Sequence, residues 1–105
     1  MRHWIAVLLI CVTGSTFATA AAPNTVQLNI KSFMFAPMTL TVKAGSTVTW
    51  TNMDQEPHTV VSQTGLFSSG ALDTSGSFSF KFDKPGTYNY VCTIHPRMVG
   101  TIVVE

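Results

Sequence analysis

The sequence predicts an all-β fold, a sandwich or a barrel, for the chain after Ala22. Short segments rich in Val, Thr, Phe and Tyr alternate there with a period of two, which is the pattern of half-buried strands. Turn residues separate these segments, and no helical periodicity of useful length interrupts them. A chain of 105 residues has room for one domain at most.

The first 20 residues are expected to be a secretory signal peptide that is removed from the mature protein. Residues 1–4 form a short positive region, residues 5–12 are apolar, and Ala18 and Ala20 give a small-residue cleavage pattern. The apolar run is shorter than the about 20 residues that a membrane span needs. We expect cleavage after Ala20, with Ala22 as the alternative, which leaves residues 21–105 as a single secreted domain.

Charge limits the classes of partner. The chain contains six Lys and Arg against five Asp and Glu, and loss of Arg2 with the signal peptide leaves five of each. The mature domain is therefore neutral, and it has neither the basic field that attracts nucleic acid nor a polybasic membrane anchor. We expect no nucleic-acid partner and no membrane span.

The first half of the domain predicts three strands. Residues 25–31 form the first, with inward-facing Val26, Leu28 and Ile30. Phe33 and Phe35 continue this alternation in broken form up to Pro37, which should end or bend the strand. Residues 40–43 form a short strand that turns at residues 44–46. Residues 47–52 form the next strand, whose buried face carries Val48 and Trp50.

The second half begins with a polar loop over residues 53–57, which delivers His58 at the start of a neighbouring strand. Residues 62–75 are rich in Ser, Gly and Thr and predict an irregular loop with apolar anchors at Leu66, Phe67 and Leu72. Residues 76–82 predict a strand with a strongly buried face of Phe78, Phe80 and Phe82. Residues 83–86 form a turn because Pro85 presets φ and Gly86 accepts a positive φ.

Two further strands complete the predicted sheet. Residues 87–92 place Tyr88, Tyr90 and Cys92 on one face, and residues 100–105 carry inward-facing Ile102 and Val104. Cys92 thus ends a strand, whereas His95 and Met98 lie on the loop that follows it. A thiolate on a rigid strand beside loop-borne ligands suits a fixed metal geometry.

The residues from Cys92 to Met98 predict most of a metal site. A thiolate, an imidazole and a thioether stand at i, i+3 and i+6, and His58 offers a second imidazole. This donor set selects copper, whereas structural zinc sites do not use methionine. The alternative is that a buried cysteine, a surface histidine and a core methionine lie close by chance. After cleavage, however, one cysteine and two histidines remain, and the site needs all of them.

A catalytic interpretation of the same residues is weaker. Cys92 with His95 could form a thiol nucleophile and its base, but the sequence offers no third group to orient the base. We therefore expect that the protein is not an enzyme.

The sequence resembles the cupredoxins, and in particular their amicyanin- and plastocyanin-like members. The resemblance rests on residues 49–52, Pro57 with His58, residues 86–92, His95 with Pro96, and residues 98–100. It implies a Greek-key β-sandwich of about seven to eight strands that transfers single electrons at a type 1 copper ion. It also implies a ligand set, with Met98 axial to a trigonal plane of His58, Cys92 and His95.

The sequence departs from the family pattern near the ligands. Thr59 stands where asparagine is common, Ile94 where proline is common, and Arg97 where an apolar residue is expected. These differences leave the ligand assignment intact but bear on the reduction potential, which hydrogen bonds around the sulfur tune.

The resulting hypothesis is a monomeric one-electron carrier in a bacterial periplasm. Its donor and acceptor would be redox proteins, such as a c-type cytochrome, a dehydrogenase or an oxidase. We expect them to dock transiently on an apolar surface around His95, formed by Phe33, Pro57, Ile94 and Pro96. The alternative function is copper binding and delivery, although such proteins favour methionine-rich sites and only Met98 lies in the ligand loop.

Overall fold

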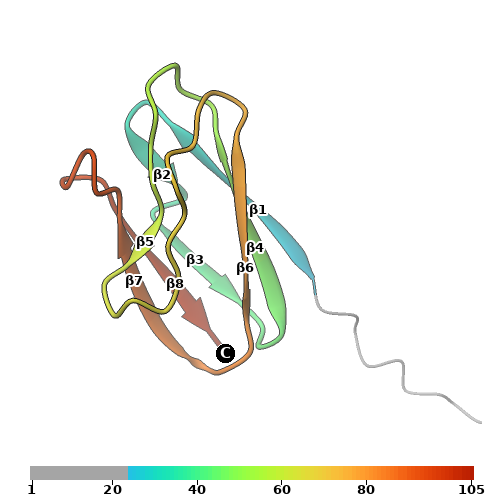
Figure 1. Cartoon of the computed structure of the whole chain (residues 1–105). Coiled ribbons are helices and arrows are strands. Elements are labelled where there is room, and N and C mark those ends of the chain that lie inside the picture. Colours follow the sequence, from blue (N-terminus) through green and yellow to red (C-terminus); the bar gives the residue numbers. More distant parts are fainter. Residues whose placement is uncertain (1–23) are drawn as a thin grey trace, which may run out of the picture.

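Eight strands in two four-stranded sheets build the protein, as a computed structural model of residues 24–105 shows (Figure 1). The predicted all-β sandwich is confirmed. The predicted signal peptide and both cleavage positions lie outside the described residues. Within residues 24–105, no helix is long and apolar enough to cross a membrane.

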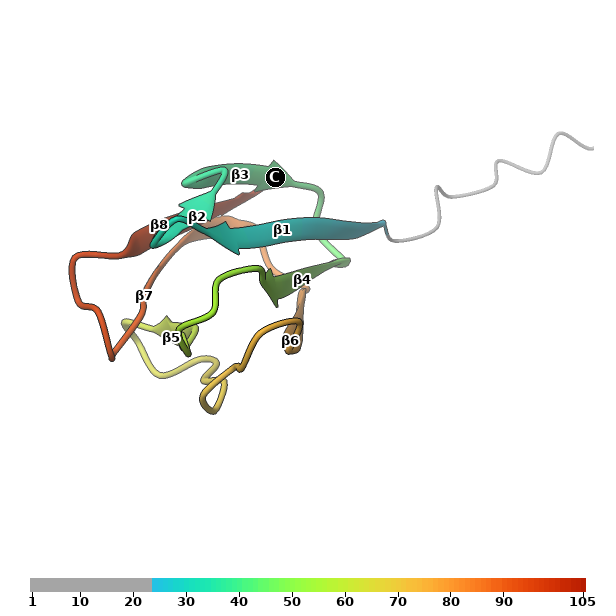
Figure 2. The same ribbon diagram turned by 90° about the horizontal axis from the view of Figure 1, so that it is seen from above.

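The strands of each sheet come from distant parts of the chain. The first sheet contains, in spatial order, β2 (Met34–Ala36), β1 (Thr25–Lys31), β4 (Ser46–Asn52) and β6 (Ser77–Phe82). The second contains β3 (Thr39–Val42), β8 (Val99–Val104), β7 (Gly86–Val91) and β5 (Val61–Ser62). Each sheet includes one parallel pair, β1 with β4 and β3 with β8. Seen from above, β5, β7 and β8 lie on one side of the interior, and β4 and β6 lie on the other (Figure 2).

The core lies between the sheets and is centred on Trp50. The alternation of apolar residues predicted for β1, β4, β7 and β8 is confirmed, although Val26 and Tyr88 are only partly buried. The buried residues of these faces are Leu28, Ile30, Val48, Trp50, Tyr90, Ile102 and Val104. The Trp50 ring is fully buried and packs edge-on against Tyr90, with ring centroids 5.4 Å apart. Cys92 belongs to the same cluster, so the core reaches the predicted metal site.

Three side chains are less buried than the sequence predicts. Phe82 is buried as expected, but Phe78 and Phe80 are only partly buried. The reason is that β6 is an edge strand with one neighbour, so part of its apolar face remains uncovered. In the irregular loop, Phe67 and Leu72 are anchors, whereas Leu66 is 50% exposed and is not.

The prediction that Phe33 continues the first strand was wrong. Ser32 and Phe33 have φ of 54° and 58°, so the chain turns there and β2 folds back onto β1. Phe35 then pairs with Ile30 on the buried face, and Phe33 is left 46% exposed.

The prediction that His58 begins a strand was also wrong. His58 forms an isolated bridge with Leu72, in which each backbone N–H donates to the carbonyl oxygen of the other. The regular strand β5 starts only at Val61, which pairs with Val91 of β7. His58 is therefore held beside the end of β7 by the irregular loop.

Candidate metal centre

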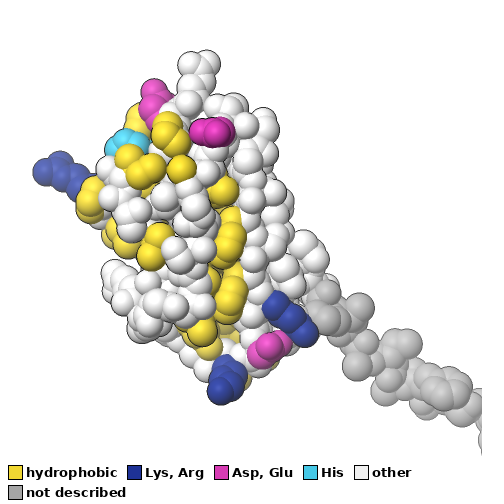
Figure 3. Space-filling model, in the orientation of Figure 1, with side chains coloured by type: hydrophobic (Ala, Val, Ile, Leu, Met, Phe, Trp, Pro, Cys, Tyr) yellow, Lys and Arg dark blue, Asp and Glu magenta, His cyan; other side chains and the backbone are white. Residues whose placement is uncertain are grey.

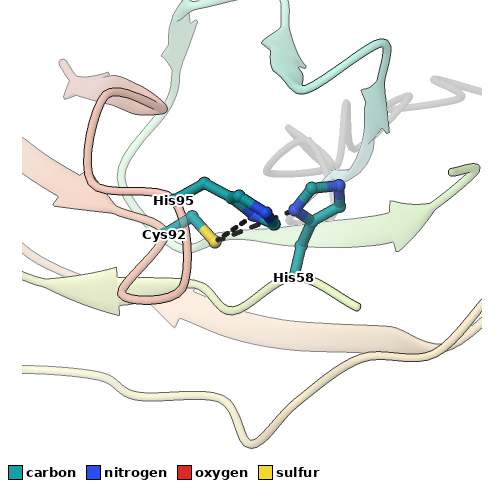
Figure 4. Close-up of side chains that lie close together, drawn as sticks. All are labelled: His58, Cys92 and His95. Carbon is teal, nitrogen blue, oxygen red and sulfur yellow. Dashed lines mark hydrogen bonds between the residues drawn. The ribbon is translucent and has the colours of Figure 1, made fainter. Parts of the chain in front are cut away.

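The side chains of His58, Cys92 and His95 converge at one end of the sandwich (Figure 4). Their potential ligand atoms all lie within 4.8 Å of one another. The Sγ of Cys92 is 3.8 Å from Nδ1 of His58 and 3.9 Å from Nδ1 of His95. The structure thus brings together three of the four residues predicted from the sequence.

The fourth, Met98, is fixed by the backbone of the ligand loop. Its N–H donates to the carbonyl oxygen of His95 at 2.8 Å, and its own carbonyl accepts the N–H of Cys92 at 3.0 Å. The Met98 side chain is 5% exposed and belongs to the core cluster. These bonds close the loop directly after β7, and they hold His95 and Met98 close to Cys92.

Asp54 orients the buried ligand His58. Its Oδ2 lies 2.9 Å from Nε2 of His58, so Nε2 carries the proton and Nδ1 presents its lone pair toward Cys92. Burial acts to raise the pKa of Asp54, but hydrogen bonds from the N–H groups of Phe33 and Ser32 and from His58 outweigh it, and the pKa is lowered. Asp54 therefore stays a carboxylate at neutral pH.

Asn52 fixes the backbone of the loop that carries Asp54. Its fully buried amide donates to the carbonyl oxygens of Glu56 and Leu72, each at 2.8 Å, and its Oδ1 accepts the N–H of Asp54 at 2.9 Å. The sequence interpretation missed both Asn52 and Asp54. The available signal was a carboxylate four residues before a candidate ligand histidine.

The Cys92 sulfur is activated by its neighbours. The backbone N–H of Thr59 points to Sγ at 3.4 Å. Burial acts to raise the pKa of Cys92, but hydrogen bonding at the sulfur, in the first place from the backbone N–H of Thr59, outweighs it and lowers the pKa to about 6. The thiolate that a metal requires is consequently available near neutral pH.

Thr59 also ties the two ligand segments together. Its Oγ1 accepts the N–H of Thr93 at 2.8 Å and lies 2.8 Å from the Thr93 hydroxyl. Thr59 is 7% exposed whereas Thr93 is exposed, so these bonds are partly buried. The threonine at this position thus links the His58 segment directly to the residue after Cys92.

The spacing of the donor atoms fits a bound metal ion. Metal–sulfur and metal–nitrogen bonds of about 2.3 and 2.0 Å at 120° would place sulfur and nitrogen about 3.7 Å apart. The observed sulfur–nitrogen distances of 3.8 and 3.9 Å are close to this value. A trigonal set of two imidazoles and one thiolate, with a buried thioether nearby, is the donor chemistry of blue-copper electron-transfer sites.

The site lies close to an apolar surface. His95 is partly exposed, unlike His58 and Cys92, and Phe33, Pro57, Ile94 and Pro96 around it are exposed, as predicted. In the space-filling view, a histidine surface is surrounded by hydrophobic side chains, with acidic and basic groups at the margin (Figure 3). The most accessible of the three converging ligands therefore lies beside an exposed apolar surface.

Known proteins share this architecture. A family model described as a cupredoxin-like domain matches residues 4–104. Amicyanin-alpha of Methylorubrum extorquens is 38% identical over 98 residues, covering 88% of this chain and 82% of that protein. Plastocyanin of Scenedesmus fuscus is 41% identical over 96 residues, covering 77% of this chain and 98% of that protein. A solved structure of an oxidised amicyanin variant has a TM-score of 0.74 at 33% identity, covering 78% of this chain and 83% of that one. The resemblance seen in the sequence is confirmed.

Proposed function

This chain belongs to the cupredoxin family, and from that premise we propose that it carries single electrons at a type 1 copper ion. His58, Cys92 and His95 would be the equatorial ligands and Met98 the axial ligand. The observation that carries this proposal is the near-equal spacing of the Cys92 sulfur from two imidazole nitrogens, at 3.8 and 3.9 Å.

Bound copper supplies the one-electron redox chemistry, and the protein supplies a fixed geometry for it. Asp54 holds the His58 ring through Nε2, while Thr59 joins the His58 segment to Thr93 beside Cys92. These hydrogen bonds are made between protein groups alone and do not pass through the metal. The ligands therefore have little freedom to rearrange when the redox state changes, which favours rapid electron transfer.

We further propose that residues 21–105 act as a monomer in the bacterial periplasm after removal of the signal peptide. The partly exposed His95 and its apolar surroundings support docking of a redox partner there. A c-type cytochrome, a dehydrogenase or an oxidase would fit this role. Such encounters are transient and bury less than about 1,200 Å².

The competing functions receive less support. A copper-delivery protein needs accessible, labile ligands, but His58 and Cys92 are both fully buried. The same burial of Cys92 does not suit a thiol nucleophile that must reach a substrate. We therefore propose neither copper delivery nor an enzymatic reaction for this site.

The test is to add Cu(II) to the purified metal-free protein. We expect one equivalent to produce the intense blue absorption of thiolate-to-copper charge transfer, and voltammetry to show a reversible one-electron couple. Zn(II) is the control, because it should bind without colour. A pale copper complex, or a copper complex without a reversible couple, would contradict the proposal.

A further inference from the structure

The turn between β1 and β2 is held in an uncommon backbone conformation. Ser32 and Phe33 both have positive φ, at 54° and 58°, and neither is glycine. A bulky residue in the left-handed region is unusual and persists only where its surroundings enforce it. The surroundings of Phe33 therefore need an explanation.

Asp54 enforces this conformation. Its Oδ1 accepts the N–H of Ser32 at 2.7 Å, and its Oδ2 accepts the N–H of Phe33 at 2.9 Å. Oδ2 also lies 2.9 Å from Nε2 of His58. One carboxylate thus joins the strained turn to a buried ligand of the metal centre.

The turn places the Phe33 ring against both ligand histidines. The ring centroid is 5.4 Å from that of His58 at an interplanar angle of 88°, and 5.2 Å from that of His95 at 85°. These are two edge-on aromatic contacts made by one ring. The ring centroids of His58 and His95 are 5.0 Å apart, so the Phe33 ring contacts two neighbouring histidine rings at once.

We propose that Phe33 is a positioning residue that holds His58 and His95 closed around the metal, and that Asp54 is the clamp that fixes Phe33 to His58. The proposal rests on the function proposed above. His95 is the partly exposed ligand, so its ring is the one that can swing toward water. The Phe33 ring occupies the space beside it and restrains this movement.

The effect should be seen most directly in the rate at which the reduced protein loses copper. In Phe33→Gly, the ring is removed while the backbone can keep its positive φ. Loss of two edge-on ring contacts corresponds to a rate increase of about ten- to a hundredfold. The measurement is capture of Cu(I) by excess bathocuproine disulfonate, followed by the absorbance of the chelate.

Three variants serve as comparisons. Phe33→Tyr keeps the ring and should release copper within about twofold of the wild-type rate. Phe33→Leu keeps apolar bulk without a ring and should be intermediate. Met34→Ala removes a neighbouring side chain that is 51% exposed, similar to Phe33, and should have little effect. Equal rates for Phe33→Gly and the wild type, or equal increases for Phe33→Gly and Met34→Ala, would overturn the proposal.

Thermal unfolding of the metal-free proteins separates positioning from general stability. Phe33→Gly should unfold at or near the wild-type temperature, because glycine accepts the left-handed conformation. A large fall in the unfolding temperature that accounts for the faster release would overturn the positioning role.

The clamp is tested by a double-mutant cycle with Asp54→Asn. If Asp54 acts in part through Phe33, its replacement should accelerate release less in the Phe33→Gly background than in the wild type. Fully additive effects would remove Asp54 from the proposal. All of these variants should still form the blue copper complex. A wild-type protein that fails to do so would instead contradict the proposed function itself.

Discussion

The aromatic core around Trp50 and the copper end around Cys92 belong to one sandwich but are held together by different forces. In the core, rings pack against each other, as Trp50 does with Phe67 and Tyr90 at centroid distances of 5.7 and 5.4 Å. Trp50 Nε1 and the Tyr90 hydroxyl are buried there without a hydrogen-bond partner among the described residues. At the copper end, by contrast, Asn52 and Asp54 use their side chains in several short hydrogen bonds.

The difference separates stability from geometry. Burial in the core is non-directional and does not depend on a metal, so it can stabilise the metal-free fold. Hydrogen bonds at the copper end are directional, so they set the positions of ligand atoms. Substitutions at the copper end should therefore change the blue absorption and the reduction potential. Substitutions in the core should instead change the stability to unfolding.

The largest effect is expected for Cys92→Ser. Thiolate-to-copper charge transfer needs sulfur, so the blue absorption should disappear completely. The metal-free variant should still give the circular dichroism of a β-sandwich and unfold cooperatively, because the replacement changes one small side chain at the edge of the core and leaves Trp50 and its aromatic neighbours in place. A variant that stays blue would exclude Cys92 as a ligand. A variant that does not fold would contradict the conclusion that the core stabilises the fold independently of the copper end.

Gly100→Ala should be the most destabilising small change in the core. Gly100 lies opposite Tyr90 in the β7–β8 pairing, and an added Cβ would overlap the Tyr90 ring. Overpacking of this kind costs about 3 kcal/mol, or roughly 10–20 °C in unfolding temperature. Gly70→Ala is the control, because nothing lies within 4 Å of its added Cβ. Similar unfolding temperatures for both variants would show that the Tyr90 ring can move.

The stability of the metal-free protein should rise with pH between about 6 and 9. The pKa of Cys92 is lowered from 9.0 to about 6 in the folded protein, so over this range the unfolded chain binds a proton that the folded one does not. The slope should approach about 1.4 kcal/mol per pH unit, measured by urea unfolding. Relative to the wild type, Cys92→Ser should lack this contribution. An identical pH dependence in both proteins would contradict the lowered pKa.

Met98→Gln should change the potential with little effect on the fold. An amide oxygen is harder than a thioether and favours Cu(II), so the reduction potential should fall by on the order of 100 mV. Voltammetry measures the shift, with Met38→Gln as a control, since Met38 is 48% exposed. An unchanged or higher potential would mean that Met98 is not the axial ligand.

Strand periodicity and donor chemistry were the parts of the protein that could be predicted from the sequence. Trp50, Tyr90 and Ile102 are buried because their strands alternate regularly. The convergence of Cys92 and His95 follows from their short separation along the chain. His58 could be chosen from the composition alone, because residues 21–105 contain only two histidines.

The rest depended on tertiary contacts that have no local signature. Phe33 looked like part of a strand, but the hydrogen bonds that Ser32 and Phe33 donate to Asp54 turn the backbone there. His58 lies outside a regular strand because its partner, Leu72, comes from an irregular loop. Phe80 is only partly buried because β6 is an edge strand, a property that depends on the order of strands in the sheet.

The strand order also has a consequence for folding. β8 lies between β3 and β7, and its parallel pairing joins Thr39 to Thr101 across most of the domain. Pairings between distant segments form slowly, typically in milliseconds to seconds. The loop from Cys92 to Met98 is closed by the strands on either side of it, so the Cys92 thiol is exposed to solvent until β8 has paired with β7. The slow pairing of β8 therefore determines how long this thiol stays accessible during folding.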